Sequence, residues 1–438
     1  MAGICVTTAL LMAGHSCVAP VLPMFAEEFG ASAAQVGATL SAFALARLVL
    51  NVPFGALADS RGRKPLMVAG PLITAAGMLG SAQCVTGLPE LFFWRFIAGA
   101  GSAAYAAGAQ ATLADLSDRS NRARTLGANQ AAVLAGAALG PCVGGFISGA
   151  PMELGVRAPF VAVGATCALA GWHAAATAPE TLKNVKRFGP HDETRSQTAA
   201  MEDGEAEREV AAAATGDVNV ASSAGDEEAK SNGEIGGENG ETTMRRLLRR
   251  RDFLAVSGLN AALFFSGAGG RATLLPLLAV QEHGYTPAGL GALFTAMAAT
   301  SALGIGPGAF LSDLFGRTRV IAPCVAASAV AVVGTATDPN VFLGAAIAWA
   351  LAHSLMGPAP AAYATEVSPE RGRAVALSAY RTFGDAGLLV GPVALGALAD
   401  CVGVGPALAA NGWVLAASAL AFTAAARGEG ARRTRDNR

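Results

Sequence analysis

Long apolar runs recur along the whole chain, and most of the charge is concentrated in the short polar segments between them. A run of about 20 apolar residues, folded as a helix, is long enough to cross the roughly 30 Å hydrocarbon core of a bilayer. We expect twelve such helices, at 4–26, 34–57, 65–86, 90–114, 124–149, 157–178, 253–281, 288–312, 319–338, 341–364, 372–399 and 405–427. Because 53% of the 438 residues are hydrophobic and only 14% are charged, composition supports an all-α membrane protein.

Positive charge is divided unevenly between the two sets of connecting segments. Those after odd-numbered spans contain only Arg157, whereas those after even-numbered spans contain Arg61, Arg63, Lys64, Arg119, Arg122, Arg124, Arg317, Arg319, Arg371 and Arg373. Since basic residues accumulate on the cytosolic side, we expect both termini and the long central segment to face the cytosol, or its equivalent across an organelle membrane. The first span has no basic leader and is interpreted as a retained helix.

The segment between the sixth and seventh spans differs in composition from the rest. Residues 190–243 are rich in Glu, Asp, Gly, Ser and Ala and nearly lack aromatic residues, so they cannot bury a core. We interpret them as a disordered tether, with a regulatory role as the alternative. The predicted organisation is an N-terminal six-helix half at 1–180, a cytosolic acidic linker with basic flanks at 181–251, a C-terminal half at 252–428 and a basic cytosolic tail at 429–438.

Motifs of the first half return in the second half at nearly one spacing. Three pairs match at offsets of 254, 251 and 251 residues: Asp59-x-x-Gly62-Arg63 with Asp313-x-x-Gly316-Arg317, Asp115 to Arg122 with Glu366 to Arg373, and Gly140-Pro141 with Gly391-Pro392. The repetition predicts two pseudo-symmetric halves. The halves differ in their interior, because Ala346 stands at the position that matches Arg95.

Several polar side chains lie deep within the predicted spans, where a charge costs at least about 2.5–3.5 kcal/mol. They are the charged residues Arg47, Arg95, Arg381 and Asp385 and the histidines His15 and His353. Asp385, roughly 20 Å into its span, is the one carboxylate that we place near mid-membrane. Arg381 is four residues away on the same helix face and could pair with it directly. Apart from His15, expected to be neutral and hydrogen-bonded across helices, we take these residues as candidates for coupling or substrate binding, with structural pairing as the alternative.

The fifth span carries glycines at intervals of four residues, which line one helix face. The stretch contains Gly136, Gly140, Pro141, Gly144 and Gly145. Proline removes a backbone donor and bends a helix, so this face is interpreted as a hinge between moving helices. Simple tight packing of small residues is the alternative.

Taken in order, these motifs resemble those of the major facilitator superfamily. The hairpin from Gly55 to Lys64 resembles its loop signature, and Arg95 to Ala103 is similar to its fourth-span arginine motif. Gly136 to Gly145 and Pro179-Glu180-Thr181 resemble motifs of its drug/proton antiporters of the tetracycline and multidrug efflux type. The resemblance covers the chain outside the linker and implies two six-helix halves that move around a central site.

The resemblance also implies roles for individual residues. Asp59 and Arg63 would latch the cytosolic side in the outward-facing state, with Asp115 as a partner of Arg63, while Arg95 would take part in proton coupling. Together with the repeat, the full latch set is Gly55, Asp59, Gly62, Arg63, Asp115, Arg122, Asp313, Gly316 and Arg317. Two departures from the family's motifs weaken the inference that this chain is a proton antiporter. The first span lacks an acidic residue, and Ala309 stands where the repeat would place glycine.

We therefore expect a secondary transporter that moves a small organic solute by alternating access, as a proton-coupled exporter. In this hypothesis Asp385 is the protonation switch, Arg381 holds it, and Arg47 and Arg95 adjust its protonation or bind an anionic substrate group. An organic-anion facilitator or proton symporter is the alternative within transport. A non-transporting membrane sensor, with the linker as its signalling segment, is the alternative of another class.

Enzymatic and ATP-driven functions have little support in the sequence. There is no P-loop, and Phe383-Gly384-Asp385 only partly resembles an intramembrane aspartyl protease box, with no second span supplying a partner aspartate. The seven cysteines form no C-x-x-C pair. We expect a monomer without cofactor, metal or nucleic acid, whose partners are its substrate, protons and the lipid bilayer.

Overall fold

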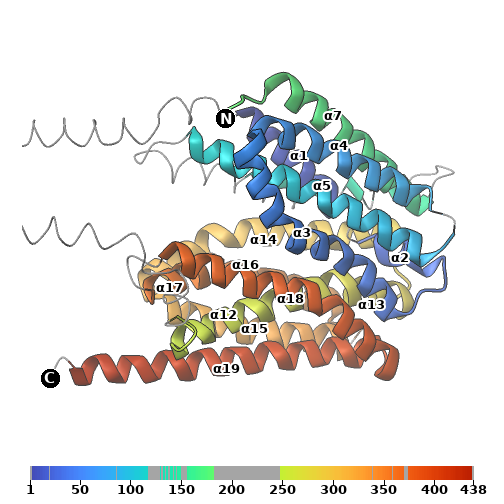
Figure 1. Cartoon of the computed structure of the whole chain (residues 1–438). Coiled ribbons are helices and arrows are strands. Elements are labelled where there is room, and N and C mark those ends of the chain that lie inside the picture. The colour runs from blue at the N-terminus through green and yellow to red at the C-terminus, as the bar shows by residue number, and fades with distance from the viewer. Residues whose placement is uncertain are drawn as a thin grey trace, which may run out of the picture.

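Every element described in the computed structural model of this protein is a helix (Figure 1). The structure describes residues 2–18, 20–84, 86–116, 155–181, 247–337, 339–357, 359–368 and 373–436, with scattered positions between 129 and 148. The predicted linker at 181–251 therefore lies almost entirely outside the described residues, as does much of the predicted fifth span. The division into halves at these boundaries stays a prediction.

The first part of the chain forms long helices that pack side by side. They are α1 (Ala2–Val18), α2 (Leu22–Glu27), α3 (Ala33–Arg61), α4 (Arg63–Ala82), α5 (Leu88–Asp115), the short turn η1 (Gly155–Arg157) and α7 (Ala158–Thr177). Helix α4 packs on α5 and α7, α3 packs on α5, and α1 packs on α7.

The second part repeats this arrangement. Its elements are α12 (Arg251–Phe265), the π-helical segment η2 (Ser266–Leu274), α13 (Leu275–Gln281), α14 (Pro287–Phe315), α15 (Arg317–Thr337), α16 (Phe342–Met356), α17 (Ala359–Glu366), α18 (Arg373–Val402) and α19 (Val404–Asp436). Nine of the described helical spans are long and apolar enough to cross a membrane. All predicted spans except the fifth have a counterpart among the described helices.

Three spans depart from the uninterrupted helices expected. The first stops at Val18 and restarts at Leu22, because Pro20 has no N–H to donate and the chain makes a tight turn in which Val21 N–H donates to Val18 O at 3.0 Å. The seventh contains the π-helical turn η2, and the tenth breaks at Gly357, which has φ +43°. The last helix extends to Asp436, so the predicted basic tail continues α19.

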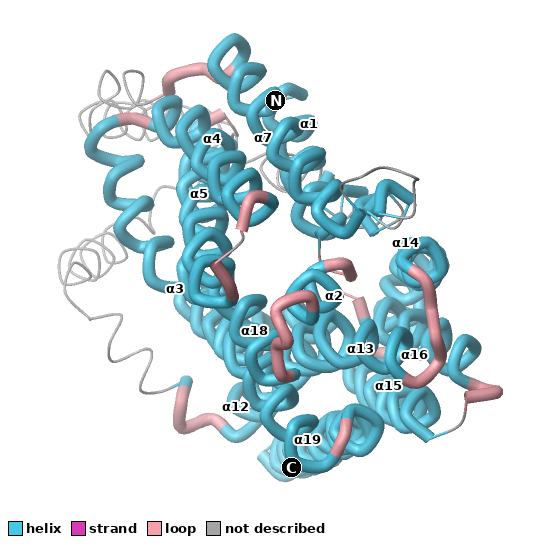
Figure 2. Tube along the Cα trace, turned by 90° about the vertical axis from the view of Figure 1, so that its right-hand side faces the viewer, coloured by secondary structure: helices cyan, strands magenta, loops and turns pink. Residues whose placement is uncertain are grey.

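Buried apolar side chains form two large clusters, one within residues 4–178 and the other within 247–422. The main contact between them is the crossing of α3 and α18 (Figure 2). Both chain ends lie at the same end of the helices, which we call the terminal face (Figure 1). The opposite end, where α3 begins and α18 ends, is the far face.

Candidate functional site

Two polar side chains, His15 and Arg95, contact one aromatic ring near the middle of the spans, and a third, Arg47, lies one helical turn after that ring. The imidazole of His15, on α1, stacks on the ring of Phe43, on α3, with ring centroids 4.2 Å apart. The guanidinium carbon of Arg95, on α5, lies 5.3 Å from the centroid of the same ring. Arg47 lies one turn after Phe43, and the charges of Arg47 and Arg95 both act on His15. We call the two cations Arg47 and Arg95, together with the neutral imidazole of His15 beside them, the cation cluster.

The backbone of α5 approaches α3 closely at the level of this cluster. A Cβ atom at Gly99 would collide with the carbonyl oxygen of Phe43 and the methyl group of Ala46. A glycine one turn after Arg95 therefore lets the guanidinium lie against α3. Arg95 is 1% exposed, so it is one of the most deeply buried large side chains described.

The expected hydrogen bond from His15 to another helix is wrong for the described residues. His15 Nδ1 is buried and has no hydrogen-bond partner there, and the ring is held by stacking on Phe43 instead. The stacking contact covers one face of the imidazole ring and supplies no hydrogen-bond partner for Nδ1.

Asp385, on α18, faces the cation cluster from the other half. Arg47 and Arg381 are the charged groups that act on its carboxylate. The direct Arg381–Asp385 pair that the spacing suggested is not formed within 4 Å in the described part of the chain; Arg381 is exposed, whereas Asp385 is half-buried. Because α18 packs on α3, Asp385 comes under the influence of a charge more than 300 residues away in sequence.

In the second half, the predicted residue His353 has Arg271 as its neighbour, an arginine that the sequence places near the outer end of the seventh span and to which we gave less weight because it could snorkel. The charge of Arg271, in η2, acts on the His353 ring of α16. Beside them, the fully buried Asn411 Nδ2 donates to Ser266 Oγ at 2.9 Å. The run Gly267-Ala-Gly-Gly270 before Arg271 was the available signal, since glycines in a span permit irregular helix geometry.

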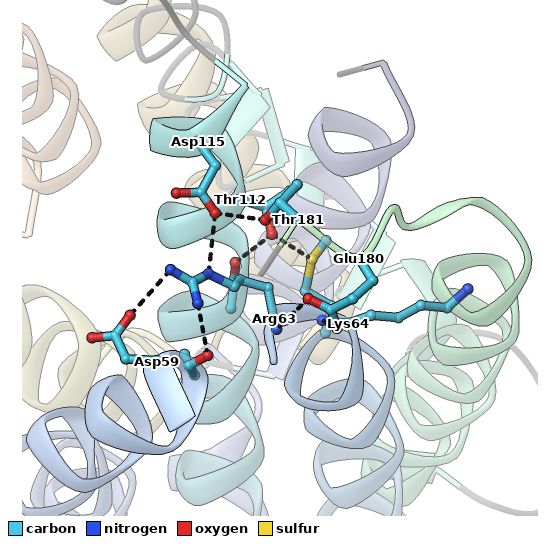
Figure 3. A network of polar contacts seen from close by, with 10 residues as sticks. Asp59, Arg63, Lys64, Thr112, Asp115, Glu180 and Thr181 are labelled. Carbon is cyan, nitrogen blue, oxygen red and sulfur yellow. Dashed lines mark hydrogen bonds and ion pairs between the residues drawn. The ribbon is translucent and has the colours of Figure 1, made fainter. Parts of the chain in front are cut away.

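A network of polar contacts holds the charged hairpin at the terminal face of the first half (Figure 3). The guanidinium of Arg63 donates from Nε to Asp115 Oδ2 at 3.1 Å and from Nη1 to Ala58 O at 3.1 Å, and its Nη2 pairs with Asp59 Oδ1 at 3.2 Å. Thr181 Oγ1 donates to the same Asp115 oxygen at 2.5 Å. The predicted residues Asp59, Arg63 and Asp115 are therefore brought together, while Arg122 lies outside the described residues.

The carboxylate of Glu180 adds a second layer to this network. Its two oxygens accept from the backbone N–H groups of Arg63 and Lys64, each at 3.2 Å, at the start of α4 (Figure 3). Gly62, with φ +112°, forms the turn before α4, and a Cβ there would press against the Glu180 carboxylate. Glycine is thus required at position 62 by both backbone angle and space.

The repeated hairpin in the second half has the matching contacts. Arg317 Nε donates to Glu366 Oε1 at 2.8 Å, and its Nη1 lies 3.3 Å from Asp313 Oδ1. Gly316, with φ +88°, makes the turn. The role of either hairpin as a latch stays a prediction, since each set of contacts lies within one half.

Contacts between the two halves occur at the far face. The carboxylate of Asp400, at the end of α18, accepts from the backbone N–H groups of Ala33 at 2.7 Å and Ala34 at 3.1 Å, at the start of α3. Gln281 Nε2 donates to Glu27 Oε1 at 2.5 Å. Sequence reasoning missed Asp400, whose only signal is a carboxylate at the end of a span.

Close backbone packing extends this contact toward mid-span. Ser41 Oγ donates to Leu389 O at 2.7 Å, and Cβ atoms at Gly37 and Gly396 would collide with the backbone of the opposite helix. These hydrogen bonds between described residues of the two halves lie between mid-span and the far face.

The described glycines of the predicted hinge all face α1. Cβ atoms at Gly136, Gly140 and Gly144 would collide with backbone or side-chain atoms between Ala9 and Cys17. This geometry favours tight packing, the alternative that the sequence left open. Pro141 lies in the same described stretch, whereas Gly145 lies outside the described residues, and the hinge role stays a prediction.

Comparison with known proteins places these features in a family. Residues 4–270 and 258–437 match the Major Facilitator Superfamily. The chain is 29% identical over 161 residues to the quinolone resistance protein NorA of Staphylococcus aureus, covering 37% of this chain and 40% of NorA. It is 33% identical over 163 residues to the multi-drug resistance efflux pump PmrA of Streptococcus pneumoniae, covering 36% of this chain and 39% of PmrA. The matched region thus spans about two fifths of these relatives.

Solved structures agree over almost the whole chain. A bacterial homologue of the human lysosomal transporter Spinster, in an inward-facing and unoccupied conformation, gives a TM-score of 0.71 at 16% identity, covering 97% of this chain and 94% of that one. The nucleoside transporter NupG gives 0.69 at 13% identity, covering 97% and 98%. At these identities the likeness concerns the fold alone, and it confirms the predicted all-α membrane fold.

Proposed function

This chain belongs to the Major Facilitator Superfamily and is a multi-pass secondary transporter, and from that premise we propose that it exports a small organic solute in exchange for protons. Alternating access moves two helical halves around a central site, so coupling requires a group whose charge state changes the interaction between the halves. The partial similarity to the efflux pumps NorA and PmrA supports export as the direction.

The observation that carries the proposal is that Arg47 and Asp385 lie on the two helices that cross between the halves, α3 and α18, and are near enough for their charges to interact. Each residue comes from a different half, and the charge of each acts on the other. A proton on Asp385 removes its attraction for Arg47 and so weakens the α3–α18 contact; loss of the proton restores it. Since one proton moving down 100 mV supplies about 2.3 kcal/mol, a single site is sufficient to drive accumulation.

The far-face contacts define the conformation that this switch would release. In the described residues the halves are joined by Asp400 on the start of α3 and by Gln281 on Glu27. We propose that these bonds close the far face and that the basic terminal face, oriented to the cytosol, gives access to the site. Opening the far face would require Asp400 to leave Ala33 and Ala34.

Reconstitution of the purified full-length protein in liposomes tests the proposal. A quinolone, the drug class in the name of the relative NorA, is supplied with and without an imposed pH gradient, and flux is followed together with internal pH. We expect saturable flux against the proton gradient for wild type and at least about a hundredfold loss of gradient-driven flux for Asp385→Asn, with exchange of substrate at equal pH retained.

Asp252→Asn is the matched control, because Asp252 is also a buried aspartate on a spanning helix but lies at the terminal face beside Arg250. It should keep the pH dependence. Unchanged pH-driven flux in Asp385→Asn would refute Asp385 as the switch. Flux in the direction of the proton gradient would replace antiport with symport.

A further inference from the structure

Among the described residues, positive charge in the middle of the spans is not balanced by carboxylates. The buried or half-buried cations there are Arg47, Arg95 and Arg271, with Arg381 more exposed, against the single carboxylate of Asp385. A cation in a low-dielectric interior is costly unless a counter-ion and hydrogen-bond acceptors accompany it. Retaining this excess therefore implies that an anion from outside the chain supplies the missing charge for part of the cycle.

The cation cluster is where hydrogen-bond acceptors are most clearly lacking. Arg95 has five N–H donors, yet within the described part of the chain its only hydrogen bond is from Nη1 to the Met78 sulfur at 3.8 Å, a weak acceptor. Its Nε, the Nε of Arg47 and the Nδ1 of His15 are all buried without a partner there. Buried polar atoms without a hydrogen-bond partner are rare in native proteins and call for a specific explanation.

The cluster is also held in place without an anion. Phe43 stacks on His15 and receives the Arg95 guanidinium on its ring, and Gly99 brings α5 against α3 at this level. The donors are therefore positioned before any ligand arrives, which lowers the entropic cost of binding. Asp385 balances only part of the cluster, because its charge acts on Arg47, whereas Arg95 is not among the groups that act on it.

We propose that His15, Arg47 and Arg95 form a subsite for an anionic group of the transported solute, a carboxylate, sulfonate or phosphate, with Phe43 as the apolar surface beside it. Two guanidinium groups can bind such a group through charge-assisted and bidentate hydrogen bonds. The inference deepens the proposed function by assigning a substrate class to the same central site. The substrate anion and Asp385 would then compete for Arg47, so binding of the substrate weakens the interaction between Arg47 and Asp385.

Thermal unfolding of the purified full-length protein in detergent tests the subsite without any proton gradient. Sodium benzoate and sodium phosphate are titrated at constant ionic strength against sodium chloride, with benzylammonium chloride as the oppositely charged partner of benzoate. We expect benzoate or phosphate to raise the unfolding temperature of wild type in a saturable way and benzylammonium to leave it unchanged. For Arg47→Gln we expect the half-saturating anion concentration to rise at least about tenfold.

Arg95→Met separates a ligand-binding role from a structural one. The change keeps volume and removes an uncompensated buried charge, so the anion-free variant should unfold at the same or a higher temperature than wild type while losing the anion response. Arg157→Gln, which removes an arginine at the far face that pairs with Glu28, is the matched control and should respond like wild type.

Two outcomes would overturn the subsite: no stabilisation of wild type by either anion, or an equal response in wild type and Arg95→Met. These outcomes are independent of the proposed proton exchange, which is read from Asp385→Asn in liposomes. An anion response that persists while pH-driven flux is absent would refute the exchange and leave the subsite standing.

Discussion

The hairpin that joins α3 to α4 and the one that joins α14 to α15 have the same backbone course. In both, a helix of 29 residues ends at a glycine with positive φ, and the next helix begins at an arginine. In both, that arginine contacts the aspartate four residues before it and a carboxylate at the end of a later helix.

The two hairpins differ in burial. The Arg63 side chain is 7% exposed and that of Asp115 17%, whereas Arg317 is 27% and Glu366 53% exposed. The first hairpin also has the Glu180 carboxylate on the start of α4. The same motif is therefore buried in one half and more exposed in the other. Its ion pairs are expected to contribute different amounts to the free energy of unfolding in the two halves.

Neutralising the two arginines should produce the largest difference between the hairpins. Arg63→Gln removes the ion-pair partner of Asp115, whose carboxylate is mostly buried. The substitution should lower the free energy of unfolding by about 3 kcal/mol. Arg317→Gln breaks ion pairs that are more exposed to solvent, so it should lower the free energy of unfolding by less than about 1 kcal/mol. Denaturant unfolding of the purified protein in detergent measures both.

Salt provides the control for this pair of variants. Pairs exposed to solvent are screened by ions, so the small effect of Arg317→Gln should fade as salt increases, whereas the effect of Arg63→Gln should persist. Equal losses of stability in the two variants would contradict the contrast in burial.

Removing the additional carboxylate should have an intermediate effect. Glu180→Ala takes away the acceptor for the N–H groups of Arg63 and Lys64 and should lower the free energy of unfolding by about 1 kcal/mol. Glu180→Gln keeps an oxygen acceptor and should lose less. If both substitutions leave the unfolding midpoint unchanged, the carboxylate does not distinguish the first hairpin from the second.

The smallest expected effect comes from Gly55, because the matching position of the second hairpin is Ala309. A Cβ atom at Gly55 would meet nothing within 4 Å, so Gly55→Ala should raise the free energy of unfolding by about 0.5–1 kcal/mol through helix propensity. We expect transport to slow nevertheless, because the absence of a side chain at Gly55 would let another helix approach α3 when the terminal face closes. A stabilised variant with unchanged transport rate would show that the glycine has no role in a second conformation.

Much of the fold could be predicted from apolar length and from the repeat. The positions of Arg63 and Asp115 also followed, because short motifs at the ends of neighbouring spans lie on the same side of a membrane. Asp400 was missed and Arg271 was given too little weight, since a carboxylate at a span end and an arginine after a glycine run fit many arrangements. The Arg381–Asp385 pair was suggested by helix periodicity, which gives a shared face but does not fix which partner a side chain meets.

The sequence by itself determined that the chain is a bundle of membrane-spanning helices in two related halves, because the cost of exposing backbone and charge to lipid leaves few alternatives. Only the tertiary structure decided which groups come near one another: Asp385 and Arg47 lie on crossing helices where their charges interact, the Asp400 carboxylate accepts hydrogen bonds at the start of α3, and His15 and Arg95 share the ring of Phe43. These contacts join helices far apart in sequence, and their geometry depends on small residues such as Gly37 and Gly99 that set how closely two helices cross.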